Sequence, residues 1–153
     1  MEEPLISFVI PVHNSSDCIG ECLEAISNQS YSNKEVIIVD NGSEDETTDI
    51  VREKCPSAKL IELEENKGHS EAANIGFESA EGKYIAKLDD DGIIGVGWLR
   101  TVVDRIQTSS DDIAAIQPKV VEYKSNGGTV EKFTEGGEIH GMISCGVLYD
   151  RKK

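Results

Sequence analysis

Three consecutive aspartates, Asp89, Asp90 and Asp91, follow an apolar run in the sequence KYIAKLDDDGII, residues 83–94. Ionised carboxylates a few ångströms apart repel by roughly 1 kcal/mol in water, and by more where they are partly buried. Two arrangements relieve this repulsion: one carboxylate stays protonated, or a divalent cation binds between them. Magnesium and manganese prefer oxygen ligands, often one or two carboxylates together with phosphate oxygens. A solvated turn, with Gly92 supplying the bend, is the alternative interpretation of this aspartate triplet.

Alternating apolar runs and amphipathic segments predict the elements that would position the triplet. The runs expected as buried strands are rich in β-branched residues, and the segments between them repeat apolar residues at helical spacing. This alternation predicts an α/β fold with a mainly parallel sheet, covered by helices on both faces. Strands are expected at 5–12, 35–40, 58–64, 83–89 and 113–123, and helices at 16–29, 43–54, 68–80 and 97–107.

Local signals add two finer predictions. Ser43 followed by Glu46 is a capping-box pattern, which would start the helix at 43–54. Side chains alternate between the faces of a strand, so Asp89 and Asp91 are expected on one side of the sheet and Asp90 on the other.

Polar side chains follow each of the first four predicted strands, and they would meet at one edge of the sheet, where α/β proteins bind ligands. Asp40 would accept hydrogen bonds from a ribose hydroxyl or a base N–H, or alternatively cap the following turn. Residues 66–68 precede a helix, whose free N–H groups favour an anion, although they also fit a plain loop. The groups after the four strands are Pro11, His13 and Asn14; 40–43; 65–70; and 89–91.

The composition limits the class of partner. The 153 residues fit one domain, 1–153, and 29 acidic against 15 basic residues give a net charge of −14, which repels nucleic acid and anionic membranes. No long apolar stretch predicts a signal peptide or an integral membrane segment. Cys18, Cys22, Cys55 and Cys145 lack zinc-type spacing, so reduced thiols are expected. The predicted location is the cytoplasm, with peripheral attachment to the inner membrane face as an alternative.

Taken together, these motifs resemble a family 2 glycosyltransferase of the GT-A fold. The resemblance covers about residues 5–123 and rests on SFVIPVHN, VIIVDNGSEDET, NKGHSEAANIGFESAEGKYIAKLDDD and GWL, in that order. Residues 133–153 are more loosely similar to the acceptor side of the rhamnosyltransferase-like branch. The resemblance implies a nucleotide-sugar-binding portion at about 5–123 and an incomplete acceptor-side segment at about 124–153.

The resemblance also implies roles for single residues. Asp91 and Asp89, the outer positions of the DXD motif, would hold Mn²⁺ or Mg²⁺, and Asp40 would read the nucleotide base. Gly92 is a departure, because another acid is common there in the family. The residues implied to bind the donor are Pro11, His13, Asn14, Asp40, Asn41, Lys67, Asn74, Asp89 and Asp90.

The implied activity is metal-assisted transfer of a sugar, with inversion, from a nucleotide-diphospho-sugar to an acceptor hydroxyl. The acceptor would be a saccharide, a lipid-linked molecule or a protein. The family's catalytic base is an Asp or Glu on a later helix, and no residue up to Lys153 matches it. We therefore expect a chain truncated before the base and inactive in isolation, unless Glu135 or Glu138 lies close enough to substitute.

Two other functions fit the same residues. One is a module that binds a nucleotide sugar without transferring it. The other is a phospho-receiver domain, which also gathers acids and magnesium at strand ends, and Lys119 would supply its lysine. The first strand, however, ends in PVHN and not in the acidic pair that a receiver needs. An incomplete domain would also expose apolar surface, which is compatible with a homodimer.

Overall fold

The computed structural model describes residues 3–108, 115–116, 122–124, 128–130 and 147–151. Strands and helices alternate over most of this length, as the periodicity predicts. The strands are β1 (Ile6–Val12), β2 (Lys34–Asp40), β3 (Lys59–Glu62), β4 (Tyr84–Lys87), β5 (Ala115–Ile116), β6 (Glu122–Lys124), β7 (Gly128–Val130) and β8 (Val147–Asp150). The helices are α1 (Ile19–Ser27), α2 (Thr47–Lys54), α3 (His69–Ser79) and α4 (Trp98–Thr108).

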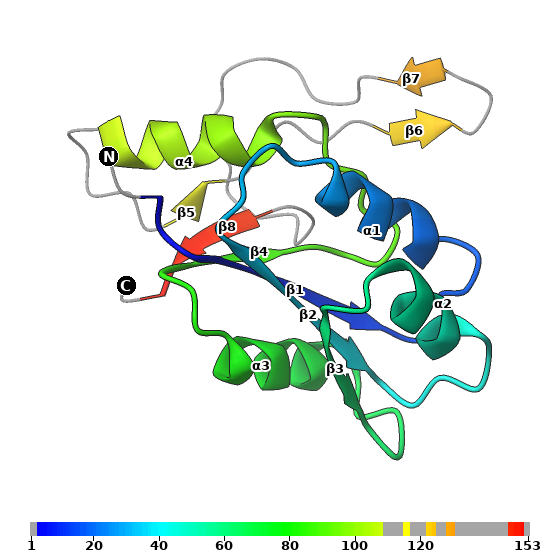
Figure 1. Ribbon diagram of the computed structural model, residues 1–153. Coiled ribbons are helices and arrows are strands. Elements are labelled where there is room, and N and C mark those ends of the chain that lie inside the picture. The colour runs from blue at the N-terminus through cyan, green and yellow to red at the C-terminus, as the bar shows by residue number, and fades with distance from the viewer. Residues whose placement is uncertain (1–2, 109–114, 117–121, 125–127, 131–146, 152–153) are drawn as a thin grey trace.

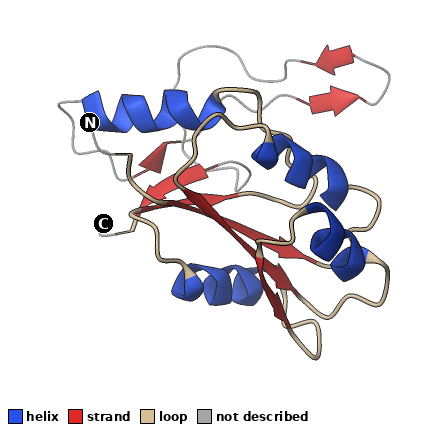
Figure 2. Cartoon of the chain, in the orientation of Figure 1, coloured by secondary structure: helices blue, strands red, loops and turns tan. Residues whose placement is uncertain are grey.

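The main sheet has six strands in the order β3-β2-β1-β4-β8-β5, and β6 and β7 form a separate antiparallel pair. β1, β2, β3 and β4 are mutually parallel, whereas β8 runs antiparallel to both β4 and β5. Helices α1, α2 and α4 lie on one side of the sheet and α3 lies on the other (Figures 1 and 2). The predicted α/β fold with a mainly parallel sheet is therefore confirmed.

Every residue of β1 is buried, because β1 is the central strand and carries helices on both faces. On one face, Phe8 and Ile10 pack with apolar residues of α1 and α4. On the other face, Val9 packs with Ala72 of α3 and with Ile85 of β4. A strand buried on both faces reads as a continuous apolar run and not as an alternating one, which explains the sequence of β1.

Two local predictions are corrected by the structure. α2 begins at Thr47, and the Thr47 N–H donates to the Asp45 carboxylate at 3.0 Å, whereas Ser43 accepts the Asn14 N–H at 2.9 Å, so the capping box is wrong. The strand expected at 113–123 contains β5 but ends outside the main sheet, because β6 pairs with β7.

Several residues named in the sequence analysis lie outside the described residues. They are Lys119, Glu135, Glu138 and Cys145. Within the residues that the structure describes, no helix combines the length and apolar character needed to cross a lipid bilayer.

Close packing of α3 on the sheet gives the first testable prediction. A Cβ at Gly76 would lie 2.4 Å from the Val9 Cγ1, so Gly76→Ala forces α3 away from β1. We expect a loss of about 1–3 kcal/mol in unfolding free energy, measured by urea denaturation. The matched control is Gly20→Ala in α1, where the added methyl meets only the flexible end of Lys54 at 3.2 Å. Helix propensity should leave that variant unchanged or up to about 1 kcal/mol more stable. Equal destabilisation of the two variants would contradict the packing argument.

Candidate functional site

The strand order reverses between β1 and β4, because β2 and β3 extend from one side of β1 while β4 lies on the other. Ligands of open α/β sheets bind beyond the carboxyl ends of the strands at such a reversal. A cavity of about 210 Å³ opens there. It is lined by Pro11, Val12, His13, Asn41, Asn66, His69 and Asp90, which come from four successive strand ends and from the start of α3.

Ser15 connects the loop after β1 to the aspartate triplet. Its side chain is 3% exposed, donates to the Asp90 carboxylate, and accepts the His13 N–H at 3.1 Å. The Ser15 N–H donates to the Thr47 hydroxyl at 2.7 Å, which ties the same loop to the start of α2. Ser15 therefore fixes both His13 and Asp90 on the wall of the cavity. The sequence analysis missed it, because a lone serine after a strand has no distinguishing pattern.

Asp45 holds the same loop from the opposite side. Its carboxylate accepts the Ser16 N–H at 3.1 Å and the Thr47 N–H at 3.0 Å, as well as the Thr47 hydroxyl. Burial by itself would raise the pKa of Asp45, but the hydrogen bonds from Thr47 and Ser16 outweigh burial and hold the pKa well below its usual range. The carboxylate therefore stays ionised at neutral pH and joins the loop after β1 to the loop after β2.

Asn14 is exposed and joins the loop after β1 to the loop after β2. It adopts a left-handed backbone conformation with φ of 51°, which asparagine tolerates better than most residues. Its N–H donates to the Ser43 hydroxyl at 2.9 Å, and its side-chain oxygen accepts the Glu44 N–H at 2.8 Å. The side-chain carbonyl of Asn14 thus already accepts a hydrogen bond from the backbone of the protein.

Asp40, at the end of β2, is 4% exposed and only half satisfied. Its Oδ2 accepts the Ser43 N–H at 3.3 Å, which is the turn-capping role, while Oδ1 is buried and has no hydrogen-bond partner. A buried acceptor without a partner costs about 1–3 kcal/mol. The carboxylate therefore caps a turn and also retains an oxygen that an additional N–H or hydroxyl would satisfy.

Asn41 joins the loop after β2 to the loop after β3. Its side-chain NH₂ donates to the Asn66 side-chain oxygen at 3.0 Å, and its own oxygen accepts the Lys67 N–H at 2.8 Å. Gly42 follows with φ of 73°, and a Cβ there would lie 2.8 Å from the Glu65 carbonyl carbon. The two loops approach so closely that only glycine fits at this position.

The aspartate triplet lies in a turn and not on a strand. β4 ends at Lys87, and the Gly92 N–H donates to the Asp89 carbonyl at 2.9 Å. The prediction from strand alternation therefore fails, because the period of two ends before the triplet begins. Asp90 lines the cavity, Asp91 is exposed, and Asp89 is partly buried.

Lys87 is a buried cation beneath the triplet that the sequence analysis did not assign to the site. Its side chain is 3% exposed, and its ammonium group pairs with the Asp89 carboxylate, which is 26% exposed. The same Asp89 oxygen lies 3.7 Å from the His69 Nε2 at the start of α3. A lysine inside an apolar strand, two residues before an aspartate, is the signal that would have identified this pair.

The structure gathers some of the predicted donor-binding residues and leaves others apart. Pro11, His13, Asn41 and Asp90 line the cavity, and Asp40 directly precedes Asn41. The side chains of Lys67 and Asn74 are exposed and do not line it. Ser15 and Lys87 support the cavity and were missed, whereas His69, which lines it, was predicted only as part of the segment 65–70.

The residues present suit a cation whose ligands include both protein carboxylates and the oxygens of a phosphate group. Among the described residues, no three His, Cys, Asp or Glu side chains form a ready-made metal cluster. Mg²⁺ and Mn²⁺ do not require one, because they commonly take one or two carboxylates plus substrate phosphate oxygens. Asp91, exposed beside the cavity-lining Asp90, matches that donor set.

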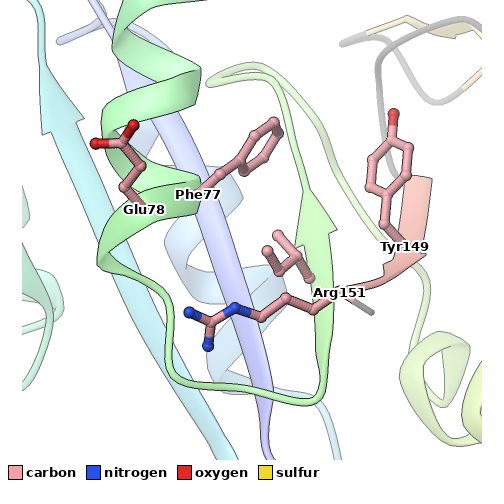
Figure 3. A pocket seen from close by; sticks show the side chains of 5 residues that line it. Phe77, Glu78, Tyr149 and Arg151 are labelled. Carbon is pink, nitrogen blue, oxygen red and sulfur yellow. The ribbon is translucent and has the colours of Figure 1, made fainter. Parts of the chain in front are cut away.

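A larger cavity, of about 350 Å³, lies near the other end of α3 (Figure 3). The ring centroids of Phe77 and Tyr149 lie 6.3 Å apart, and Ile85, Glu78 and Arg151 complete the lining. This cavity is almost wholly apolar and contains none of the strand-end carboxylates. We therefore place the functional site at the smaller, polar cavity.

The family model described as "Glycosyl transferase family 2" matches residues 7–152. The chain belongs to glycosyltransferase family 2. It is 36% identical over 132 residues to glycosyltransferase AglE of Haloferax volcanii, covering 82% of this chain and 42% of AglE. The chain thus spans less than half the length of this curated relative.

Two solved structures share the fold of this family 2 chain. TarS 1–349 of S. aureus in complex with UDP superposes with a TM-score of 0.80 and 25% identity, covering 96% of this chain and 47% of that one. The mannosyltransferase PcManGT of Pyrobaculum calidifontis, in complex with GDP-Man and Mn²⁺, gives 0.68 and 27%, covering 75% of this chain and 35% of that one. These likenesses confirm the GT-A fold.

The loop junction at Asn41 gives the second prediction. Asn41→Ala removes the acceptor of the Lys67 N–H, so hydrogen exchange at that amide should accelerate by about tenfold. The control is Asn33→Ala. Asn33 lies just before β2, and its side chain donates to the Glu3 carbonyl, so its loss should leave the exchange of the Lys67 amide unchanged. Exchange measured by NMR distinguishes the two. An unchanged Lys67 amide in Asn41→Ala would show that Asn41 does not hold the loop.

Proposed function

We propose that the chain binds a nucleotide-diphospho-sugar and is the donor-binding part of an enzyme that transfers the sugar to an acceptor hydroxyl. The observation that carries this proposal is the polar cavity at the strand-order reversal, where His13, Asn41 and Asp90 converge in a family 2 chain. Two similar structures contain related ligands, the nucleoside diphosphate UDP in TarS and the nucleotide sugar GDP-Man with Mn²⁺ in PcManGT.

A divalent cation, Mn²⁺ or Mg²⁺, would let this protein of net charge −14 hold an anionic diphosphate. Asp91 would be the principal ligand, because it is the most exposed carboxylate of the triplet. Asp89 is the second ligand expected from the sequence. When bound, the cation would stabilise the negative charge of the leaving diphosphate.

The residues of the chain would bind and orient the nucleotide. The buried Oδ1 of Asp40 would accept a base N–H or a ribose hydroxyl, and so would choose among nucleotides. Pro11 and His13 would contact the nucleotide from the end of β1 and its following loop. Lys67 and Asn74 would reach the donor only from the exposed side of α3 and the loop before it, and Asn14 would act mainly by bracing the loop.

The second half of the reaction concerns the acceptor, for which saccharide, lipid-linked and protein hydroxyls are all proposed. Inversion is the stereochemistry that the family resemblance implies, with a base removing the acceptor proton. We assign no base, since Glu135 and Glu138 lie outside the described residues. The rhamnosyltransferase-like branch, the homodimer and the peripheral membrane location likewise remain predictions.

A nucleotide-sugar-binding module without transfer activity is the alternative. Both proposals require donor binding, and only the enzyme releases free nucleoside diphosphate. An assay of donor turnover, with and without a mixture of candidate acceptors, separates them. The phospho-receiver alternative is not retained, because the chain belongs to glycosyltransferase family 2.

Substitutions in the site provide the third prediction. Asp91→Ala should weaken Mn²⁺-dependent binding of UDP or GDP by more than about tenfold, because the cation loses its main carboxylate. Asp40→Ala should instead change the relative affinities for UDP and GDP. Both effects are measured by calorimetric titration with and without Mn²⁺.

Asp104→Ala is the control for the loss of one negative charge, since Asp104 is exposed on α4. It should bind as the wild type does. Identical titrations for the wild type and Asp91→Ala would remove the metal assignment. If no nucleoside diphosphate or nucleotide sugar raised the melting temperature of the wild type, with or without Mn²⁺, the proposed function itself would be refuted.

A further inference from the structure

The buried ion pair between Lys87 and Asp89 changes what the triplet can do. Lys87 lies on the α3 face of β4, because Ile85, two residues earlier, packs with Ala72 of α3. In the sheet register Lys87 stands beside Val9 of β1. An ammonium group in apolar surroundings needs an anionic partner, and the Asp89 carboxylate supplies it.

We propose that Lys87 commits Asp89 to this internal ion pair, so that Asp89 orients the acidic turn and is not a ligand of the metal. Lys87 is then a positioning residue that also limits how strongly the site attracts a cation. The inference rests on the proposed function, which supplies the metal and the diphosphate. It replaces the expectation from the sequence that Asp89 is the second metal ligand.

The contacts of the three carboxylates support this division. The Asp89 Oδ1 faces both the Lys87 ammonium and the His69 ring, so a cation approaching that oxygen would meet a positive charge. Asp90 accepts a hydrogen bond from the neutral Ser15 hydroxyl, and a carboxylate can keep such a bond while it ligates a metal. Asp90 and the exposed Asp91 are therefore the carboxylates suited to the cation.

Removal of the Lys87 ammonium group is expected to strengthen metal binding. Lys87→Met keeps the length and the apolar stem of the side chain but leaves one more uncompensated negative charge at the turn. Mn²⁺ should therefore bind about tenfold more tightly than to the wild type. A residue with only a structural role would weaken metal binding when lost, so the direction of the change is the decisive readout.

The matched control is Lys83→Met, which has the same net charge and lies just before the other end of β4. It should change Mn²⁺ affinity by less than about twofold, because the charge lost is exposed and remote from the turn. Mn²⁺ alone is titrated, by calorimetry or by electron paramagnetic resonance. Thermal unfolding verifies that each variant is folded. If Lys87→Met does not fold, Lys87→Gln replaces it in the titrations.

The double variant decides the role of Asp89. Asp89→Asn alone should weaken Mn²⁺ binding by about tenfold, because the Lys87 charge is then uncompensated. Lys87→Met combined with Asp89→Asn removes both charges, so the affinity should return to within about threefold of the wild type. If Asp89 is a metal ligand, the double variant stays as weak as Asp89→Asn, and the proposal is overturned.

The remaining outcomes are also decisive. Equal Mn²⁺ affinities for the wild type and Lys87→Met overturn the proposal, and so does undetectable binding by both. Binding by Lys87→Met with none detectable in the wild type supports it. These titrations contain no nucleotide, so a failure of UDP or GDP to bind the wild type bears on the proposed function and leaves the result for Lys87 readable.

Discussion

The site depends on one constraint, which is that β1 is buried on both faces and lies where the strand order reverses. The chain leaves β1 toward α1 on one face, while β4 is reached from α3 on the other (Figure 1). The loops after these two strands therefore meet beyond the carboxyl edge of the sheet. The hydrogen bond from Ser15 to Asp90 connects the two loops, and the cavity lies beside this contact.

The three carboxylates of the triplet show how one short turn accommodates concentrated negative charge. A proton or a cation are the two remedies that charge repulsion suggests from sequence alone. The structure adds a third, because a buried lysine pairs with Asp89, while Ser15 donates to Asp90 and solvent surrounds Asp91. Each carboxylate therefore has a different environment, and neighbouring positions in one motif need not share one role.

Much of the fold follows from periodicity, whereas the limits of the elements do not. The sequence of β1 is an apolar run interrupted only by Ser7, and it is long enough to identify a central strand. No pattern in the last strand region predicts that β8 runs antiparallel to β4. The predicted strand at 83–89 reaches Asp89, and strand alternation was extended from it to Asp91, whereas the structure has the competing possibility, a turn closed by Gly92. Contacts between segments far apart in the sequence, such as Asp89 with His69 and Ser15 with Asp90, require the tertiary arrangement, whereas the ion pair of Lys87 with Asp89 is local in sequence.

The polar residues at the site differ in whether other groups of the protein satisfy their hydrogen-bonding atoms. The side-chain oxygens of Asn14 and Asn41 accept backbone N–H groups of neighbouring loops, so these residues shape the site before any ligand arrives. Asp40 is different, because one buried oxygen has no partner and the cost of leaving it so falls only when a donor approaches. A ligand gains most where the fold leaves a polar atom unsatisfied. Under the proposed function, that rule would give the end of β2 the greatest influence on nucleotide choice, while the charge of the turn after β4 would act on the cation and the diphosphate.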